Sequence, residues 1–271
     1  MRELKFHFLD VGHGDTTIIE IPMGKEDKIF GVVDCVKFED KVKKYLEDLG
    51  AEKLAFVVAT HPHDDHIDGI VNLLEAYVGK VGEIWDSGYL YGSPTYMGLL
   101  SYLDKHDEIT GVLIDSGNIV RFGKTRLSVL APPDRLLIDS NEQNNINNAS
   151  IVIRVEYGES KILLSGDAQF GSWAHMRINH PEMLKAHVLK VAHHGSKHGN
   201  FLEALELVSP IKAVISAGSG NPQLFPHKYA LETLREVQKK YKTAEIYNTA
   251  DVGNVVMSCK GSWHFSVETE S

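Results

Sequence analysis

Short apolar runs separated by glycine and proline alternate with segments of helical periodicity along this chain. The run over 54–60 is short and rich in β-branched and aromatic residues, which predicts a fully buried strand. Apolar positions then return at helical spacing over 67–74, which predicts a helix. We expect further strands over 4–9, 17–21, 29–33, 84–85, 151–157, 161–164, 188–192 and 213–216, two more within 117–130, and further helices over 38–49, 96–105, 173–180 and 228–240. Strand pairs mixed with helices indicate two packed sheets with helices outside them.

Length and composition fit one domain over 1–271. An α/β chain of this length commonly folds around a single core, and 43% apolar residues are enough to fill one. The formal net charge of −9 argues against indiscriminate adhesion to nucleic acid, which depends on clustered lysine and arginine. Bound divalent ions would reverse this charge locally, so a phosphodiester substrate is not excluded.

The two cysteines and the terminal residues bear on the compartment. Cys35 and Cys259 are far apart and match no metal-knuckle or disulfide spacing, so we expect free thiols in a reducing compartment. The first residues mix charged and apolar side chains, unlike a signal peptide. No apolar run approaches the roughly 18 residues of a membrane helix. We therefore expect a cytoplasmic protein without membrane insertion.

A dense group of metal-binding side chains follows the predicted strand at 54–60. Residues 61–66 read His-Pro-His-Asp-Asp-His, which places three imidazoles and two carboxylates on a strand-to-helix loop. Neutral imidazole and carboxylate together suit zinc and manganese among the common divalent ions. A polar loop that is rich in histidine by chance is the alternative.

The spacing of His61, His63, Asp65 and His66 is the HxHxDH pattern of the metallo-β-lactamase superfamily. The segment FLDVGHGDT at 8–16 also resembles the FLDVGQGD opening of the soluble hydrolase domain of the ComEC competence proteins. Later segments resemble that family in the same order: LLSGDA at 163–168, LKVAHHGS at 189–196, ISAG at 215–218 and PH at 226–227. The resemblance implies an α+β fold, the four-layer αββα sandwich of the metallo-β-lactamases, here expected as a standalone hydrolase.

The resemblance also implies a dinuclear metal site. By this resemblance His61 and His63 hold one ion, Asp65 and His66 hold the second, and Asp167 bridges both. His227 is expected to complete the second ion's ligands. The alternatives are a helix N-cap for Asp167 and an ordinary surface histidine for His227.

The first ion lacks one ligand in this assignment. Many relatives have another histidine before the strand that leads to the bridging aspartate, but residues 144–150 contain none. Asn148 and Ser150 are instead expected to support the ligands or to orient substrate. His193 and His194 are the remaining candidates. Because successive residues of a strand point in opposite directions, we expect one of them, with a slight preference for His194, to face the metals.

Three further residues have two interpretations each. Asp15 either orients an imidazole ligand or bonds to its own turn. Asp34 lies where the superfamily has a buried aspartate, and a structural role is favoured. Lys190 either holds a phosphate oxygen or is a solvated surface lysine.

The expected chemistry depends on the ions. Two divalent metals about 4 Å apart lower the pKa of a bridging water from 15.7 toward roughly 7, which supplies a hydroxide nucleophile. The candidate catalytic residues are Asp65, Lys190, His193 and His194, with either histidine as a donor to the leaving group. No Gly-x-Ser-x-Gly motif supports a serine nucleophile.

The leading hypothesis is a zinc- or manganese-dependent phosphodiesterase or nuclease with a nucleic acid or nucleotide substrate. Because the fold does not determine the substrate, hydrolysis of a lactam, lactone or thioester is one alternative. A non-catalytic regulatory or binding protein that keeps the fold is another.

Overall fold

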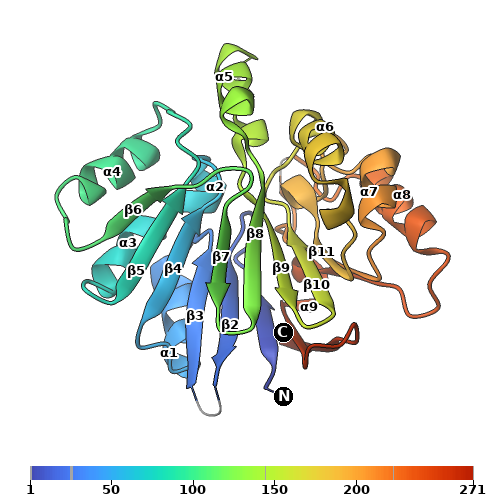
Figure 1. Cartoon of the computed structure of the whole chain (residues 1–271), viewed down its shortest axis with the longest axis horizontal. Helices are drawn as coiled ribbons and strands as arrows, with labels where there is room; N and C mark the ends of the chain where they lie inside the picture. The colour runs from blue at the N-terminus through green and yellow to red at the C-terminus, as the bar shows by residue number, and fades with distance from the viewer. Residues whose placement is uncertain (1, 25–26, 144, 222, 271) are drawn as a thin grey trace.

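The strands form two sheets in the computed structural model, which describes residues 2–24, 27–143, 145–221 and 223–270 (Figure 1). The first sheet has the order β15-β14-β1-β2-β3-β4-β5-β6. Its strands are β1 (Leu4–Phe8), β2 (Thr17–Met23), β3 (Asp27–Val33), β4 (Leu54–Ala59), β5 (Val81–Asp86), β6 (Thr110–Leu113), β14 (Asn254–Cys259) and β15 (Ser266–Glu270). β3 to β6 pair in parallel, so their carboxyl ends lie at one edge of the sheet.

The second sheet has the order β13-β12-β11-β10-β9-β8-β7. Its strands are β7 (Ile119–Phe122), β8 (Thr125–Ala131), β9 (Val152–Tyr157), β10 (Ser160–Leu164), β11 (Val188–Lys190), β12 (Lys212–Ile215) and β13 (Glu245–Asn248). β10 to β13 pair in parallel, whereas β7 to β10 are antiparallel neighbours. The turns after β10 and β11 therefore leave the sheet at the same edge.

Helices cover the outer faces of both sheets (Figure 1). Outside the first sheet lie α1 (Lys43–Asp48), α3 (Ile70–Ala76) and α4 (Pro94–Leu103). Outside the second lie α6 (Phe170–Asn179), α7 (Leu202–Val208) and α8 (Lys228–Gln238). The remaining helical segments are α2 (Asp64–Ile67), α5 (Asp134–Gln143), α9 (Thr249–Val252), η1 (Phe38–Val42), η2 (Ile146–Ala149), η3 (Pro181–Met183) and η4 (Ala192–Gly195).

Strand β4 shows why the run over 54–60 is apolar throughout. Phe56 and Val58 pack between the two sheets, whereas Val57 and Ala59 pack beneath the helices of the first sheet. All four are at most 1% exposed, since successive side chains point to opposite faces and both faces are covered. A third apolar cluster joins the second sheet to α6, α7 and α8. The layers are therefore helix, sheet, sheet, helix, as expected for an αββα sandwich; the expectation of a single domain stays a prediction.

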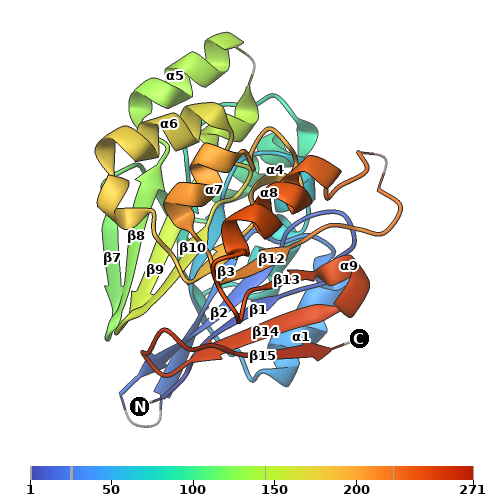
Figure 2. The same cartoon turned by 90° about the vertical axis from the view of Figure 1, so that its right-hand side faces the viewer.

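Two differences from the expected elements matter for the site. The strand expected over 188–192 ends at Lys190, and the turn η4 follows it. The hairpin of β14 and β15 was not expected, and it places β14 beside β1 (Figure 2). β15 was missed because most of its residues are exposed and polar. It therefore has no alternation of apolar and polar residues, which is the pattern that predicts a half-buried strand.

Two expectations about the whole chain can be compared with the structure. Both cysteines are free, and both are buried. Among the helices of the described ranges, none has the length and apolar character needed to cross a bilayer.

Candidate metal centre

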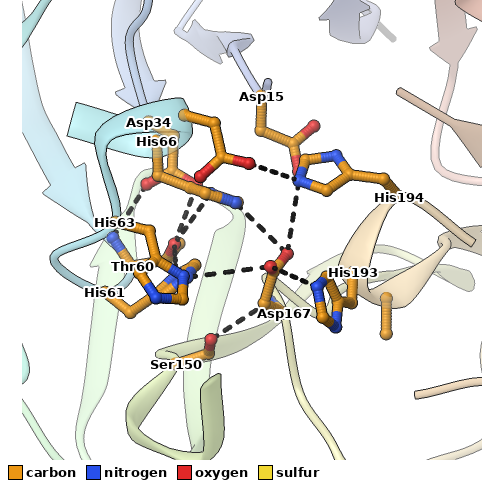
Figure 3. Close-up of polar contacts among 12 residues, drawn as sticks. Asp15, Asp34, Thr60, His61, His63, His66, Ser150, Asp167, His193 and His194 are labelled. Carbon is orange, nitrogen blue, oxygen red and sulfur yellow. Dashed lines mark hydrogen bonds and ion pairs between the residues drawn. The ribbon is translucent and has the colours of Figure 1, made fainter. Parts of the chain in front are cut away.

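The candidate site lies where loops from both sheets meet. In the first sheet, the loops that follow β1, β3 and β4 leave from one edge, because β1 and β3 are both antiparallel to β2 and β3 is parallel to β4. In the second sheet, the turns after β10 and β11 meet the same region (Figure 3). The topology thus brings together side chains that are far apart in the sequence.

The HxHxDH loop follows β4 and begins α2. His63 has extended backbone angles and is the N-cap residue, so the helix starts at Asp64. His61 Nε2 lies 3.0 Å from His63 Nδ1 and 3.7 Å from Asp167 Oδ2. These three residues place one ligand atom each within 4.8 Å of one another. The arrangement matches the ligand set expected for the first ion.

Asp167 lies between two sets of imidazoles (Figure 3). Its Oδ1 lies 3.2 Å from His66 Nε2 and 3.8 Å from His194 Nε2. Its Oδ2 lies 3.7 Å from His61 Nε2 and 3.6 Å from His193 Nε2. Each carboxylate oxygen therefore faces a different pair of nitrogen atoms, as a bridging ligand requires.

The loop that contains Asn148 and Ser150, which were expected to support the ligands, holds the backbone at Asp167. The Asp167 N–H donates to Ser150 Oγ at 3.1 Å. Gly166 has a φ of +47°, and a Cβ there would lie 3.1 Å from Ser150 Cβ. The alternative that Asp167 is a helix N-cap is wrong, because α6 begins later with Gln169 as its N-cap residue. Asn148 Oδ1 accepts from Ser172 N in the first turn of α6 and so supports this loop.

Asp34 determines the orientation of His66. Its Oδ2 accepts a hydrogen bond from His66 Nδ1 at 2.6 Å and another from Thr60 Oγ1 at 2.7 Å. The Thr60 N–H donates to Asp34 Oδ1 at 2.8 Å. Because Nδ1 of His66 is the donor to Asp34, the neutral form of the ring has its lone pair on Nε2, on the side that faces Asp167. The structural role favoured for Asp34 thus consists of orienting a candidate ligand.

His193 and His194 lie on a left-handed turn rather than on a strand. Their φ values are +49° and +52°, a region that non-glycine residues rarely adopt and that often occurs at functional sites. Because the turn interrupts strand alternation, both Nε2 atoms face Asp167 within 3.8 Å. The strand alternation from which only one metal-facing ring was expected is therefore absent here, and the expectation that one ring, His194 by preference, faces the metals stays a prediction.

Hydrogen bonds at Nδ1 distinguish the two rings chemically. His194 Nδ1 donates to the Ser216 carbonyl at 2.8 Å, so its Nε2 offers a lone pair. His193 Nδ1 accepts from the Gln169 amide at 3.0 Å, so in the neutral ring Nε2 carries the hydrogen. Asn145 donates to Gln169 Oε1 at 3.3 Å, which fixes the orientation of that amide. In their neutral forms, His194 thus has a lone pair at Nε2 and His193 has an N–H there.

Asp65 contacts a residue that the sequence analysis did not select. Asp65 Oδ2 lies 3.3 Å from His194 Nε2 and 3.2 Å from His13 Nε2. The His13 and His194 ring centroids are 5.0 Å apart. His13 lies within the FLDVGHGDT segment, and its position between two glycines and in place of the glutamine of FLDVGQGD could have drawn attention to it.

Lys190 is buried and paired with Asp15. Its Nζ lies 2.7 Å from Asp15 Oδ1 and 2.8 Å from Oδ2, and the two side chains are 4% and 6% exposed. The interpretation of Lys190 as a solvated surface lysine is therefore wrong. Burial favours the neutral acid, but the Lys190 ammonium outweighs it and holds the pKa of Asp15 below its usual value. The suggested phosphate contact of Lys190 stays a prediction.

His227 lies outside the ligand groups formed by the described residues. Its Nδ1 accepts a hydrogen bond from Tyr229 N at 3.1 Å, as the N-cap of α8. His194 instead lies beside Asp65 and Asp167, where the second ion is expected. Ligation by His227 stays a prediction that none of its contacts supports.

The buried atoms at this centre fit a metal. Both Asp167 oxygens, His66 Nε2 and His194 Nε2 are buried without a hydrogen-bond partner in the part of the chain that the structure describes. Such atoms are costly unless something binds them. Imidazole nitrogen and carboxylate oxygen are ligands that zinc, manganese and iron accept. The described residues therefore fit divalent ions.

The buried imidazoles and carboxylates of this centre shift one another's pKa values. Burial opposes a charged His66, but the Asp167 and Asp34 carboxylates outweigh it and raise the pKa of His66 well above its usual value. Burial likewise opposes ionised Asp167, yet the neighbouring imidazoles, His66 first, hold its pKa well below the usual range. Burial lowers the pKa of His61 well below normal, which leaves a neutral imidazole able to bind a metal.

Comparison with solved structures identifies the fold. The metallo-β-lactamase fold protein YhfI from Bacillus subtilis matches 94% of this chain and 100% of its own, with a TM-score of 0.58 and 14% identity. The chain has the metallo-β-lactamase fold. The diiron β-hydroxylase CmlA from Streptomyces venezuelae matches 96% of this chain and 54% of its own at TM-score 0.59 and 14% identity. A diphosphatase of the PhnP family matches 95% and 99% at TM-score 0.52 and 12% identity. The metallo-β-lactamase fold thus occurs in proteins of different named activities.

Curated sequences include relatives of this metallo-β-lactamase-fold chain. ComE operon protein 3 of Bacillus subtilis is homologous and 24% identical over 245 residues, 84% of this chain and 30% of that protein. Recombination protein 2 of Haemophilus influenzae is 39% identical over 109 residues, 40% of this chain and 13% of that protein. The chain thus spans less than a third of the length of either relative. No protein-family model matches it.

Proposed function

We propose that this protein is a metal-dependent hydrolase of phosphodiester bonds in nucleic acid or nucleotides, with zinc or manganese as its ions. The observation that carries this proposal is Asp167, whose two oxygens face different pairs of imidazole nitrogens across a buried centre. The name of Recombination protein 2 refers to a process of nucleic acids, which supports such a substrate. The diphosphatase supports phosphate-ester chemistry on this fold.

The candidate ligands would divide between two ions. His61, His63 and Asp167 would hold the first ion, and Asp65, His66, His194 and Asp167 would hold the second. Two divalent ions there would supply Lewis acidity and would lower the pKa of a bound water toward about 7. Asp34 orients His66 for this role, and Ser150 holds the backbone of Asp167.

His193 donates a hydrogen bond through its Nε2–H to the leaving oxygen of a bound substrate. Its Nε2–H is set by the Gln169 amide, and its side chain is 18% exposed, so a bound substrate can reach it. His194, at 1% exposure, is closed to substrate and keeps its ligand role. Lys190 is paired with the buried Asp15, which it holds in the ionised form, and its contact with a phosphate oxygen stays a prediction.

The experiment combines metal analysis with a choice of substrates. Metal content is measured by elemental analysis, and turnover of bis(p-nitrophenyl) phosphate is compared with turnover of nitrocefin and a thioester, each with zinc or manganese. We expect phosphodiester turnover that is lost in His63→Ala and Asp167→Ala. The half-exposed His106, on the surface beside Glu108, provides the matched control His106→Ala. Phosphodiester turnover equal to that of the wild type in both His63→Ala and Asp167→Ala overturns the proposal. Turnover of nitrocefin or the thioester alone overturns it as well.

A further inference from the structure

The loop between β1 and β2 brings a third imidazole to the second ion's side of the centre. His13 Nε2 and His194 Nε2 lie 3.2 Å and 3.3 Å from the same atom, Asp65 Oδ2. The three ligand atoms all lie within 4.8 Å of one another. Ligand atoms that are each about 2.0–2.2 Å from one ion lie about 3.0–3.5 Å apart in common geometries. The spacing around Asp65 therefore fits coordination.

The backbone of this loop is held on two sides. The Asp15 N–H donates to the Asp65 carbonyl at 2.9 Å. Gly14 has a φ of +132°, and a Cβ there would lie 2.7 Å from Asp65 O. On the other side, a Cβ on Gly218 would lie 2.4 Å from His13 N. Only residues without a side chain allow this approach, so the position of His13 is fixed before any ligand binds.

One nitrogen of the His13 ring lacks a hydrogen-bond partner within the described ranges. This nitrogen, Nδ1, is buried. The side chain is 26% exposed, and Asp65 beside it is 29% exposed, so this side of the centre is partly open. Phe225 packs near the ring, with centroids 6.5 Å apart. His13 is thus held at the mouth of the site with Nε2 directed inward.

We propose that His13 is a ligand of the second ion, which it binds through Nε2 beside Asp65 and His194. This inference rests on the proposed metal centre and assigns it a residue outside the HxHxDH, Asp167 and His194 set. The first ion has only His61, His63 and Asp167 as described ligands. Because the second ion then has more ligands than the first, the two ions bind in order, with the second ion tighter.

The test measures metal binding directly and does not depend on turnover. Metal-free protein is titrated with Co²⁺, which reports its ligands through visible absorption, and with Zn²⁺ by calorimetry. We expect two ions per wild-type chain, one tighter than the other. In His13→Ala the tighter ion weakens by at least about 10-fold, and its Co²⁺ spectrum changes because an imidazole is lost. His106→Ala is the matched control and should titrate as wild type.

A second variant separates ligation from hydrogen bonding. His13→Gln retains a donor that can reach Asp65 but lacks an imidazole, so we expect it to resemble His13→Ala. Wild-type affinity and spectrum in His13→Gln would show that His13 only orients Asp65, and this result overturns the proposal. Unchanged binding in His13→Ala overturns it as well. Wild-type protein that binds no ion would instead remove the proposed function itself. Circular dichroism of the metal-free variants checks that they are folded.

Discussion

Asp34 accepts a 2.6 Å hydrogen bond from His66 Nδ1, and this contact directs the opposite ring nitrogen toward Asp167. Asp34 adopts a φ of +57°, which places its carboxylate beneath the HxHxDH loop. Two bonds from Thr60 hold the same carboxylate. The centre thus depends on a residue that reaches no ion itself.

The first prediction concerns this support. Asp34→Ala removes the acceptor that fixes the ring and tautomer of His66, so metal affinity should fall about 10–100-fold. Calorimetric titration of metal-free protein with Zn²⁺ measures the change. Asp107→Ala, an exposed aspartate between α4 and β6, serves as the control. Unaltered affinity in Asp34→Ala would show that Asp34 is not needed to orient His66.

The second prediction separates His193 from His194. If His193 stabilises the leaving oxygen by a hydrogen bond, His193→Ala should keep both ions and lose about 10²–10³-fold in turnover of substrates with poor leaving groups. Substrates that release p-nitrophenolate need little stabilisation of the leaving oxygen and should be affected much less. The two rates, measured beside metal content, check this expectation. Loss of an ion from His193→Ala would instead identify His193 as a ligand.

The third prediction concerns the buried pair of Lys190 and Asp15. Lys190→Met leaves a buried carboxylate without its cation, which should lower the free energy of unfolding by about 3–5 kcal/mol. Adding Asp15→Asn removes the charge of the unpaired carboxylate and should restore part of the lost free energy of unfolding. Urea unfolding of the metal-free proteins gives the comparison. A double variant no more stable than Lys190→Met would show that the lone charge is not the cause.

The fourth prediction concerns pH and a histidine away from the metal centre. His7 is 3% exposed, and its Nδ1 bonds to the Tyr45 hydroxyl, which in turn donates to Glu270. Burial, followed by the nearby charges of Lys5 and Lys28, lowers the pKa of His7 to about 4 from 6.5. The unfolded chain therefore binds the proton first as the pH falls.

The sign of the effect follows from this order. The contribution of neutral His7 to stability is complete above about pH 6.5 and is lost as the pH falls toward 4, by roughly 3 kcal/mol in total. His7→Gln cannot titrate, so its stability should fall less over this interval. Urea midpoints of both proteins between these pH values provide the test. Parallel curves for the two proteins would contradict the assignment.

The candidate ligands that follow β4 were predictable because two local signals coincide. A strand buried on both faces is apolar throughout, and the HxHxDH spacing follows at its carboxyl end. Asp167 similarly follows the apolar strand β10. The two-sheet arrangement followed from strand pairs mixed with helices, because each sheet must cover its apolar faces.

The rest of the site depends on contacts between distant segments. The left-handed angles of His193 and His194 are stabilised by the surrounding structure, so the strand alternation expected from the sequence is absent at these two residues. The contact between His13 and Asp65 requires glycines at 14 and 218, which lie 204 positions apart, to admit the loop. The resemblance assigned His227 to the second ion and left His194 as a candidate for the first, whereas His194 lies beside Asp65 and His227 caps α8. The spacing of residues along the sequence carries no information about close contacts between such distant segments.

The placement of β1 between β2 and β14 has a consequence for the order of folding. The Asp10 N–H, just before the His13 loop, donates to Asn254 Oδ1 at 2.8 Å, a contact across 244 positions. During synthesis on the ribosome, β1 can pair early with β2, but its other edge stays open until Cys259 has emerged. The loop at the mouth of the site therefore gains its last support only when residues 254–259 have emerged, and we expect firm cation uptake on that side to wait for them.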